Sequence, residues 1–157
     1  MQLKIISSFL ILLSLVFLVP SVVFAATSDG SVDSKVEIND SIENGPTLAN
    51  GYWFGRSVEN VGDLDGNGVN DLAVGAILDP AGGTKRGAVH IIFLNSDGTL
   101  TKQSVEIDDT TANGPTLSDN DRFGYAIANI GDLDGNGVND LAVWVSEDRI
   151  TLADMIV

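Results

Sequence analysis

The 157-residue chain contains no cysteine, so it can form neither a disulfide framework nor a thiolate metal site. It has one histidine, and only 8 lysines and arginines against 22 acidic side chains, which gives a formal net charge of −14. This balance argues against nucleic-acid binding, because affinity for a phosphate backbone comes largely from lysine and arginine. Aromatic residues make up only 6% of the chain, whereas glycine occurs 17 times. These proportions favour a loop-rich β protein over a helical bundle.

The single long apolar run lies at the N-terminus. A short basic start precedes an almost continuously apolar stretch over residues 5–19, which Pro20 ends. Ala25, with Val23 two positions before it, is typical of a signal-peptidase site. We therefore predict that residues 1–25 are a signal peptide cleaved after Ala25, and that the mature protein is secreted or lies at the cell surface without a membrane span. The alternative is a retained anchor, which needs about 20 apolar residues.

Aspartate accounts for 17 of the 22 acids, and many of these aspartates lie in a repeated segment. Residues 60–74 recur at residues 129–143 with a single difference, and the offset of 69 residues also relates residues 44–48 to residues 113–117. One structural unit is therefore used at least twice. The excess of aspartate over glutamate fits turns and hard-cation sites rather than solvated helices.

Each unit reads as short strands separated by turns, and no segment from residue 26 to residue 157 has convincing helical periodicity. In the first unit we expect strands over residues 54–61, 72–77, 87–94 and 100–107, with a hairpin turn at residues 95–98. Four antiparallel strands with one long loop are typical of a propeller blade rather than of a sandwich. The predicted fold class is all-β, built from four-stranded antiparallel blades of a β-propeller.

The repeated loop has the composition of a calcium site. Oxygen-bearing side chains occupy loop positions 1, 3, 5 and 9, with glycines between them, so that short side chains can gather hard oxygens around one cation. Mg²⁺ is less suitable because it keeps several waters and needs a stricter octahedron. We predict two Ca²⁺ sites, each with four side chains and one backbone carbonyl as ligands. The first set is Asp63, Asp65, Asn67, Asp71 and the carbonyl of Val69, and the second is Asp132, Asp134, Asn136, Asp140 and the carbonyl of Val138.

Two other interpretations of the loop compete with a calcium site of this kind. A cluster of Asp, Asn and Gly can be a simple turn, although its recurrence at unchanged spacing argues against that. An EF-hand shares the first positions, but its twelfth residue must be a bidentate glutamate. Here the twelfth positions are Val74 and Val143, at the end of an apolar strand pattern, which makes an EF-hand improbable.

The order of these features resembles a known repeat. Phe54-Gly55, the acidic loop, the apolar strand that starts at Leu72 and the later Gly87-Ala88-Val89 together resemble the FG-GAP repeat of integrin α subunits and of many bacterial and archaeal exported proteins. The resemblance covers residues 54–107 well and residues 123–143 again. It implies a seven-bladed propeller with Ca²⁺ in hairpin loops on one face, an extracellular location, and a role in adhesion or ligand recognition.

The chain divides into five predicted parts. They are a signal peptide at residues 1–25, a linker with a last-strand remnant of a preceding blade at 26–53, a complete repeat at 54–107, an inter-blade loop at 108–122, and a partial second repeat at 123–157. Propellers close with about four to eight blades, so we expect an incomplete propeller. Further repeats in cis, or self-association, would complete it.

The remaining residues carry little catalytic signal. His90, the only histidine, lies in a strand pattern where we expect an outward-facing structural side chain. No Ser-His-acid constellation and no cysteine nucleophile can be assembled, so we expect no enzymatic activity. The leading hypothesis is an exported calcium-binding module that recognises an extracellular protein or glycan. The alternatives are a purely structural calcium-stabilised repeat and an accessory propeller segment of a larger exported enzyme.

Overall fold

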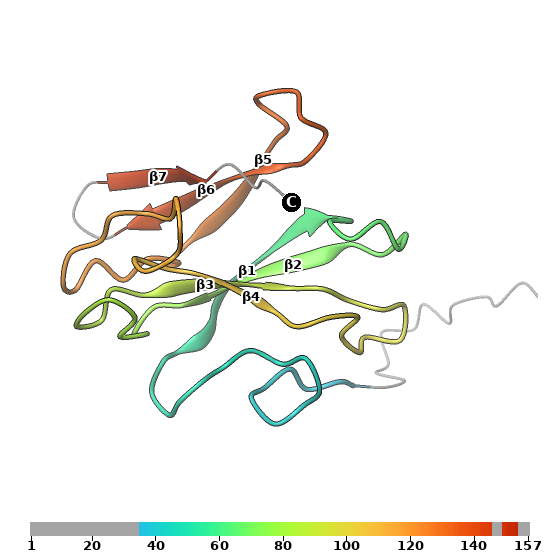
Figure 1. The fold of residues 1–157 in the computed structure, drawn as a ribbon, viewed down its shortest axis with the longest axis horizontal. Coiled ribbons are helices and arrows are strands. Elements are labelled where there is room, and N and C mark those ends of the chain that lie inside the picture. Colours follow the sequence, from blue (N-terminus) through green and yellow to red (C-terminus); the bar gives the residue numbers. More distant parts are fainter. Residues whose placement is uncertain (1–34, 146–148, 154–157) are drawn as a thin grey trace, which may run out of the picture. The chain divides into compact units, whose positions relative to one another are not determined.

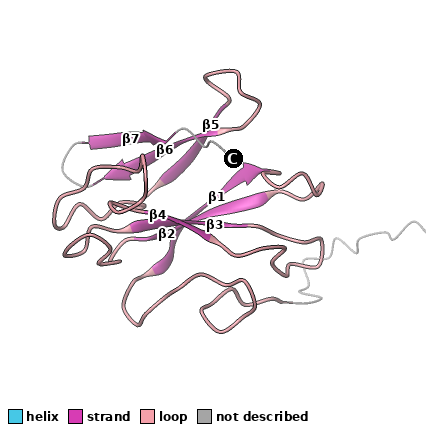
Figure 2. Cartoon of the chain, in the orientation of Figure 1, coloured by secondary structure: helices cyan, strands magenta, loops and turns pink. Residues whose placement is uncertain are grey.

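The computed structural model describes residues 35–145 and 149–153, which contain seven strands and no helix (Figures 1 and 2). The predicted all-β fold is thereby confirmed. The predicted signal peptide, residues 1–25, lies outside the described residues. Within the described ranges, no helix has the length and hydropathy needed to span a bilayer.

The first repeat forms a four-stranded antiparallel sheet in which neighbours along the chain are neighbours in the sheet. Its strands are β1 (Phe54–Gly62), β2 (Asp71–Ala76), β3 (Ala88–Ile92) and β4 (Val105–Ile107). β3 is buried along its whole length and β2 along nearly all of it, as their apolar and β-branched sequences require. This up-and-down order is that of a propeller blade.

The return strand is shorter than the sequence predicted. We expected it over residues 100–107, but β4 starts only at Val105, and Leu100 forms an isolated bridge with Leu94 across the hairpin turn. The strand is short because residues between Leu100 and Val105 form hydrogen bonds with the segment before β1 instead of with β3. The Gln103 amide donates to the carbonyl of Gly45 at 2.7 Å, and the backbone N–H of Ser104 donates to that of Asn44 at 3.0 Å.

The second repeat forms a three-stranded antiparallel sheet, again in chain order. Its strands are β5 (Ile127–Gly131), β6 (Asp140–Val145) and β7 (Arg149–Ala153). The register repeats that of the first sheet, because Gly62 lies opposite Asp71 and Gly131 lies opposite Asp140, each after an irregularity in the ladder. The two segments, which differ at one position only, therefore adopt the same local structure.

The main core lies between the two sheets and joins them. It consists of buried apolar side chains from both repeats and from the connection between them, namely Val61, Ala73, Val89, Ile91, Phe93, Leu117, Phe123, Leu141, Val143 and Val145. Glycines let the backbones approach closely at this interface. A β-carbon on Gly75 would lie 2.1 Å from the carbonyl oxygen of Gly124, so a larger residue cannot replace Gly75 without a shift of the backbone. The Ser57 hydroxyl donates to that same carbonyl at 2.6 Å.

The opposite face of the first sheet is covered by the segment before β1. Ile38 and Ile42 pack against Val74, Ile92 and other side chains of a second, smaller apolar cluster. The predicted last-strand remnant within residues 26–53 forms no strand in the described part of that range, residues 35–53.

The prediction that His90 faces outward is wrong. The side chain lies in the central strand β3 and is only 1% exposed, because both faces of this strand are covered. The rings of His90 and Phe54 meet edge to face with their centroids 5.6 Å apart. The histidine is therefore part of the interior of the first repeat.

Candidate metal centres

The two acidic loops connect equivalent strands, β1 to β2 and β5 to β6. Each loop begins just after an asparagine whose side chain accepts the N–H of the glycine two residues later. The side-chain oxygen of Asn60 accepts the N–H of Gly62 at 2.8 Å, and that of Asn129 accepts the N–H of Gly131 at 2.9 Å. Both glycines have a positive φ, 86° and 78°, which turns the chain out of the strand and into the loop.

Each loop brings three of its four predicted side-chain ligands together. Asp63, Asp65 and Asp71 each offer a carboxylate oxygen, and these oxygens lie within 4.8 Å of one another. The second loop repeats the arrangement with Asp132, Asp134 and Asp140. Two loops that are 69 residues apart in the chain thus form equivalent carboxylate clusters at the predicted positions.

In each loop, the predicted asparagine ligand forms a hydrogen bond with the predicted valine ligand. The side-chain oxygen of Asn67 accepts the N–H of Val69 at 2.7 Å, and that of Asn136 accepts the N–H of Val138 at 2.7 Å. These bonds hold each asparagine in the turn that leads to the last aspartate. Coordination by the asparagine side chains and by the valine carbonyls stays a prediction.

The first aspartate of each loop organises the turn. Asp63 accepts backbone N–H groups from Gly66, Asn67 and Gly68 at 2.7–3.0 Å. Asp132 accepts the three equivalent groups at 2.7–3.0 Å. The glycines have positive φ values between 77° and 91°, which explains why the loops carry glycine at these points.

These hydrogen bonds also favour the charged form of the first aspartate. The bond from Gly68, assisted by those from Asn67 and Gly66, lowers the pKa of Asp63. In the second loop, the hydrogen bond from Gly137, assisted by those from Gly135 and Asn136, lowers the pKa of Asp132. Both carboxylates are therefore ionised at neutral pH.

The last aspartate of each loop is buried at the start of a strand. Asp71 is 0% exposed and Asp140 is 5% exposed. One oxygen of Asp71 accepts the N–H of Leu64 at 2.8 Å, and the other accepts the N–H of Leu94, beyond the end of β3, at 2.9 Å. Asp140 likewise accepts the N–H of Leu133 at 2.7 Å. This carboxylate joins the loop to the sheet in both repeats.

Further hydrogen bonds fix the first loop to the hairpin that follows β3. The Asn67 amide donates to the carbonyl of Leu94 at 2.8 Å, and the Thr101 hydroxyl donates to Asp65 at 2.6 Å. The second loop is tied to the first sheet, because Asn129 donates to the carbonyl of Asn60 at 2.9 Å and Asn139 to that of Val61 at 3.2 Å. The two loops therefore lie at the same end of their sheets.

The donor sets fit a hard divalent cation. Each carboxylate oxygen has two acceptor sites, so most of these oxygens keep capacity after the hydrogen bonds described above. Among the described residues, the ion pairs involve Lys35 and Arg86, which bond to Glu37, Asp109 and Asp119 and not to the loops. Three carboxylates held together without a basic side chain repel one another, and a divalent cation would relieve that repulsion.

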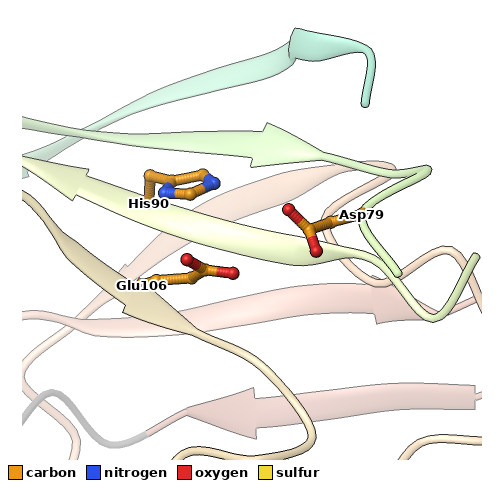
Figure 3. Close-up of side chains that lie close together, drawn as sticks. All are labelled: Asp79, His90 and Glu106. Carbon is orange, nitrogen blue, oxygen red and sulfur yellow. The ribbon is translucent and has the colours of Figure 1, made fainter. Parts of the chain in front are cut away.

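A third cluster combines two carboxylates with the single histidine, and sequence reasoning missed it. Asp79, His90 and Glu106 each offer one ligand atom, and these atoms lie within 4.8 Å of one another (Figure 3). The three residues come from a turn and two strands and share no spacing that a motif would reveal. The only signal in the sequence was a lone histidine between apolar residues.

Comparison with known proteins agrees with the repeat seen in the sequence. Residues 54–92 match the family described as FG-GAP repeat. The chain is 39% identical over 101 residues to "Integrin alpha pat-2" of Caenorhabditis briggsae, a match that covers 63% of this chain and 8% of the relative. It is 41% identical over 96 residues to "Integrin alpha-PS5" of Drosophila melanogaster, a match that covers 61% of this chain and 9% of that relative. The chain is also 34% identical over 99 residues to "Integrin alpha-6" of Gallus gallus, a match that covers 63% of this chain and 8% of that relative. The aligned part of the chain thus spans less than a tenth of these relatives.

The buried carboxylate of Asp71 should support the fold even without metal. We expect Asp71→Ala to lower the free energy of unfolding by about 2 kcal/mol in EDTA, because the N–H groups of Leu64 and Leu94 both lose their acceptor. Urea denaturation followed by fluorescence measures this. The matched control is Asp134→Ala in the second loop, an exposed aspartate, for which we expect a change within about 0.5 kcal/mol. Equal effects of the two substitutions would contradict the structural role of Asp71.

Proposed function

We propose that this chain, which carries an FG-GAP repeat and resembles integrin α subunits, is an exported calcium-binding repeat module for extracellular adhesion or macromolecular recognition. The observation that carries the calcium proposal is the duplicated cluster, in which the same three carboxylates gather within 4.8 Å in two loops. The proposed module is not an enzyme. Its proposed partners are an extracellular protein or glycan ligand and further FG-GAP repeats.

Calcium is the cation that the loops suit best. Ca²⁺ takes six to eight oxygen ligands in flexible geometry, and aspartate, asparagine and backbone carbonyl oxygens are all available in these loops. The loops supply no nitrogen or sulfur ligand that would favour a softer metal. The backbone N–H groups already hold Asp63 and Asp132 in place, so little ordering remains for the ion to impose.

A bound ion would act on the fold as well as on a surface. Asp71 and Asp140 belong both to the carboxylate clusters and to the hydrogen bonds that join loop to sheet. An ion held by these groups would fasten the start of β2 and of β6 to the exposed tips of the loops. The bonds from Asn67 and Thr101 to the neighbouring hairpin favour a second candidate function, a purely structural calcium-stabilised repeat.

The extracellular part of the proposal has two supports. The first is the predicted signal peptide at residues 1–25, and the second is the similarity to integrin α subunits over about 60% of this chain. The loop tips are exposed and lie at one end of the two sheets, where a macromolecule could reach both. Secretion or display at the cell surface follows as part of the same proposal.

Calcium titration tests the metal sites. We expect calorimetry to show two Ca²⁺ per wild-type chain, one for Asp63→Ala or Asp132→Ala alone, and none for the double variant. Ca²⁺ should also raise the thermal midpoint of the wild type, because an ion at one hundred times its Kd stabilises the folded state by about 2.7 kcal/mol per site. Asp40→Ala, which removes an exposed acid outside the loops, should leave the stoichiometry at two. A folded wild-type chain that binds no Ca²⁺ at millimolar concentration would refute the proposal.

Recognition can be separated from a structural role with immobilised protein. We expect the wild-type chain to bind at least one member of a panel of extracellular-matrix proteins and arrayed glycans in Ca²⁺, and to lose that binding in EDTA. The double variant Asp63→Ala with Asp132→Ala should lose it in Ca²⁺ as well. Binding of two Ca²⁺ without any Ca²⁺-dependent partner in the panel would instead support the structural repeat.

A further inference from the structure

The cluster of Asp79, His90 and Glu106 lies on the face of the first sheet that is opposite the main core. His90 and Glu106 are direct cross-strand neighbours on β3 and β4, so their side chains rise from the same face. Asp79 follows β2 in a turn that its own backbone stabilises, since its carbonyl accepts the N–H of Gly87 at 2.9 Å. Figure 3 shows the three side chains converging, with the imidazole directed toward Asp79.

The cluster contains a buried nitrogen without a partner. Nε2 of His90 is buried and accepts or donates no hydrogen bond among the described residues. The whole histidine is 1% exposed, and Asp79 beside it is 3% exposed. An unpaired buried polar atom costs free energy comparable to a lost hydrogen bond, so a native protein rarely keeps one without a ligand or a function.

The cluster also has uncompensated negative charge. None of the ion pairs in the described ranges reaches Asp79 or Glu106. Asp79 accepts the N–H of Ala81 at 2.9 Å, and Glu106 has a side-chain hydrogen bond with Asp108, another acid. Burial, with the nearby charges of Asp79 and Asp108, raises the pKa of Glu106 to about 7. Burial also raises the pKa of Asp79 and lowers that of His90 to about 4. His90 thus offers a ring nitrogen to the two carboxylates in a buried site, and its Nε2 has no hydrogen-bond partner in the described part of the chain.

We propose that Asp79, His90 and Glu106 form a binding site for Zn²⁺, separate from the two calcium loops. Two carboxylates would balance the charge of a divalent ion, and the imidazole would supply a nitrogen ligand. A neutral imidazole with two carboxylates suits Zn²⁺, whereas Ca²⁺ prefers oxygen ligands throughout. Three protein ligands leave a fourth position of the tetrahedron for water or for a group from another molecule.

The geometry allows this assignment with small side-chain movements. Ligand atoms around a tetrahedral zinc ion lie ~3.3 Å apart, and those of the cluster now lie within 4.8 Å. Rotation of the two carboxylate side chains would close the difference, while the ring of His90 stays against Phe54. Glu106 is only partly buried, so the ion can enter beside it.

The single histidine makes the site directly observable. In an untagged full-length chain with its loops saturated by Ca²⁺, all imidazole signals in an NMR spectrum come from His90. We expect one equivalent of Zn²⁺ to shift these signals and calorimetry to show one Zn²⁺ per chain. Glu106→Gln keeps the shape of the side chain and should weaken Zn²⁺ binding at least about tenfold. His90→Phe, which keeps a ring beside Phe54, should abolish the binding.

The control separates this site from the calcium loops. The double variant Asp63→Ala with Asp132→Ala should still bind one Zn²⁺ and show the same imidazole shift, whether or not it binds Ca²⁺. If His90→Phe does not fold, the wild-type spectrum and Glu106→Gln decide the question. Imidazole signals that stay unchanged at saturating Zn²⁺ would overturn the proposal, and a proton shared within the cluster would then account for its charge. Zn²⁺ binding of equal strength in the wild type and Glu106→Gln would also overturn it.

Discussion

The buried carboxylate at the end of each acidic loop is the constraint on which the rest of the structure depends. Asp71 starts β2, accepts the N–H groups of Leu64 and Leu94, and belongs to the cluster with Asp63 and Asp65. It therefore fixes the loop, the end of β3 and the candidate metal site at once. Asp140, at the start of β6, likewise accepts the N–H of Leu133 and belongs to the second cluster. The aspartate at this point therefore supports the fold as well as any ion that the loop would hold.

The two repeats are joined by the phenylalanine and glycine that begin the second repeat. Phe123 is fully buried in the core between the sheets, and Gly124 lies so close to Gly75 that neither glycine has space for a larger side chain. In the second repeat the position of Gly75 is taken by Trp144, which packs against Tyr125 with ring centroids 4.7 Å apart. The phenylalanine and glycine of one repeat thus dock on the small residues of the repeat before it, and the loops are thereby held at one end.

Much of the fold could be predicted because the chain repeats itself. Recurrence of one segment at a fixed offset revealed the unit, and apolar runs too short for helices gave β2 and β3 nearly at their observed bounds. The grouping of three carboxylates in each loop followed from alternate spacing in a tight turn. Contacts between segments far apart in the chain could not be predicted from local sequence patterns. The bonds of Gln103 and Ser104 to the N-terminal segment shorten β4, and the cover over β3 buries His90 beside Glu106 and Asp79.

The central claim is that each acidic loop holds a divalent cation through its clustered aspartates. The most direct test is a crystal structure of the chain grown with saturating Ca²⁺, with anomalous diffraction used to place the ions. The account predicts one ion in each loop, bound by Asp63, Asp65 and Asp71 in the first and by Asp132, Asp134 and Asp140 in the second. Ordered loops without an ion, or ions bound only elsewhere on the molecule, would contradict it.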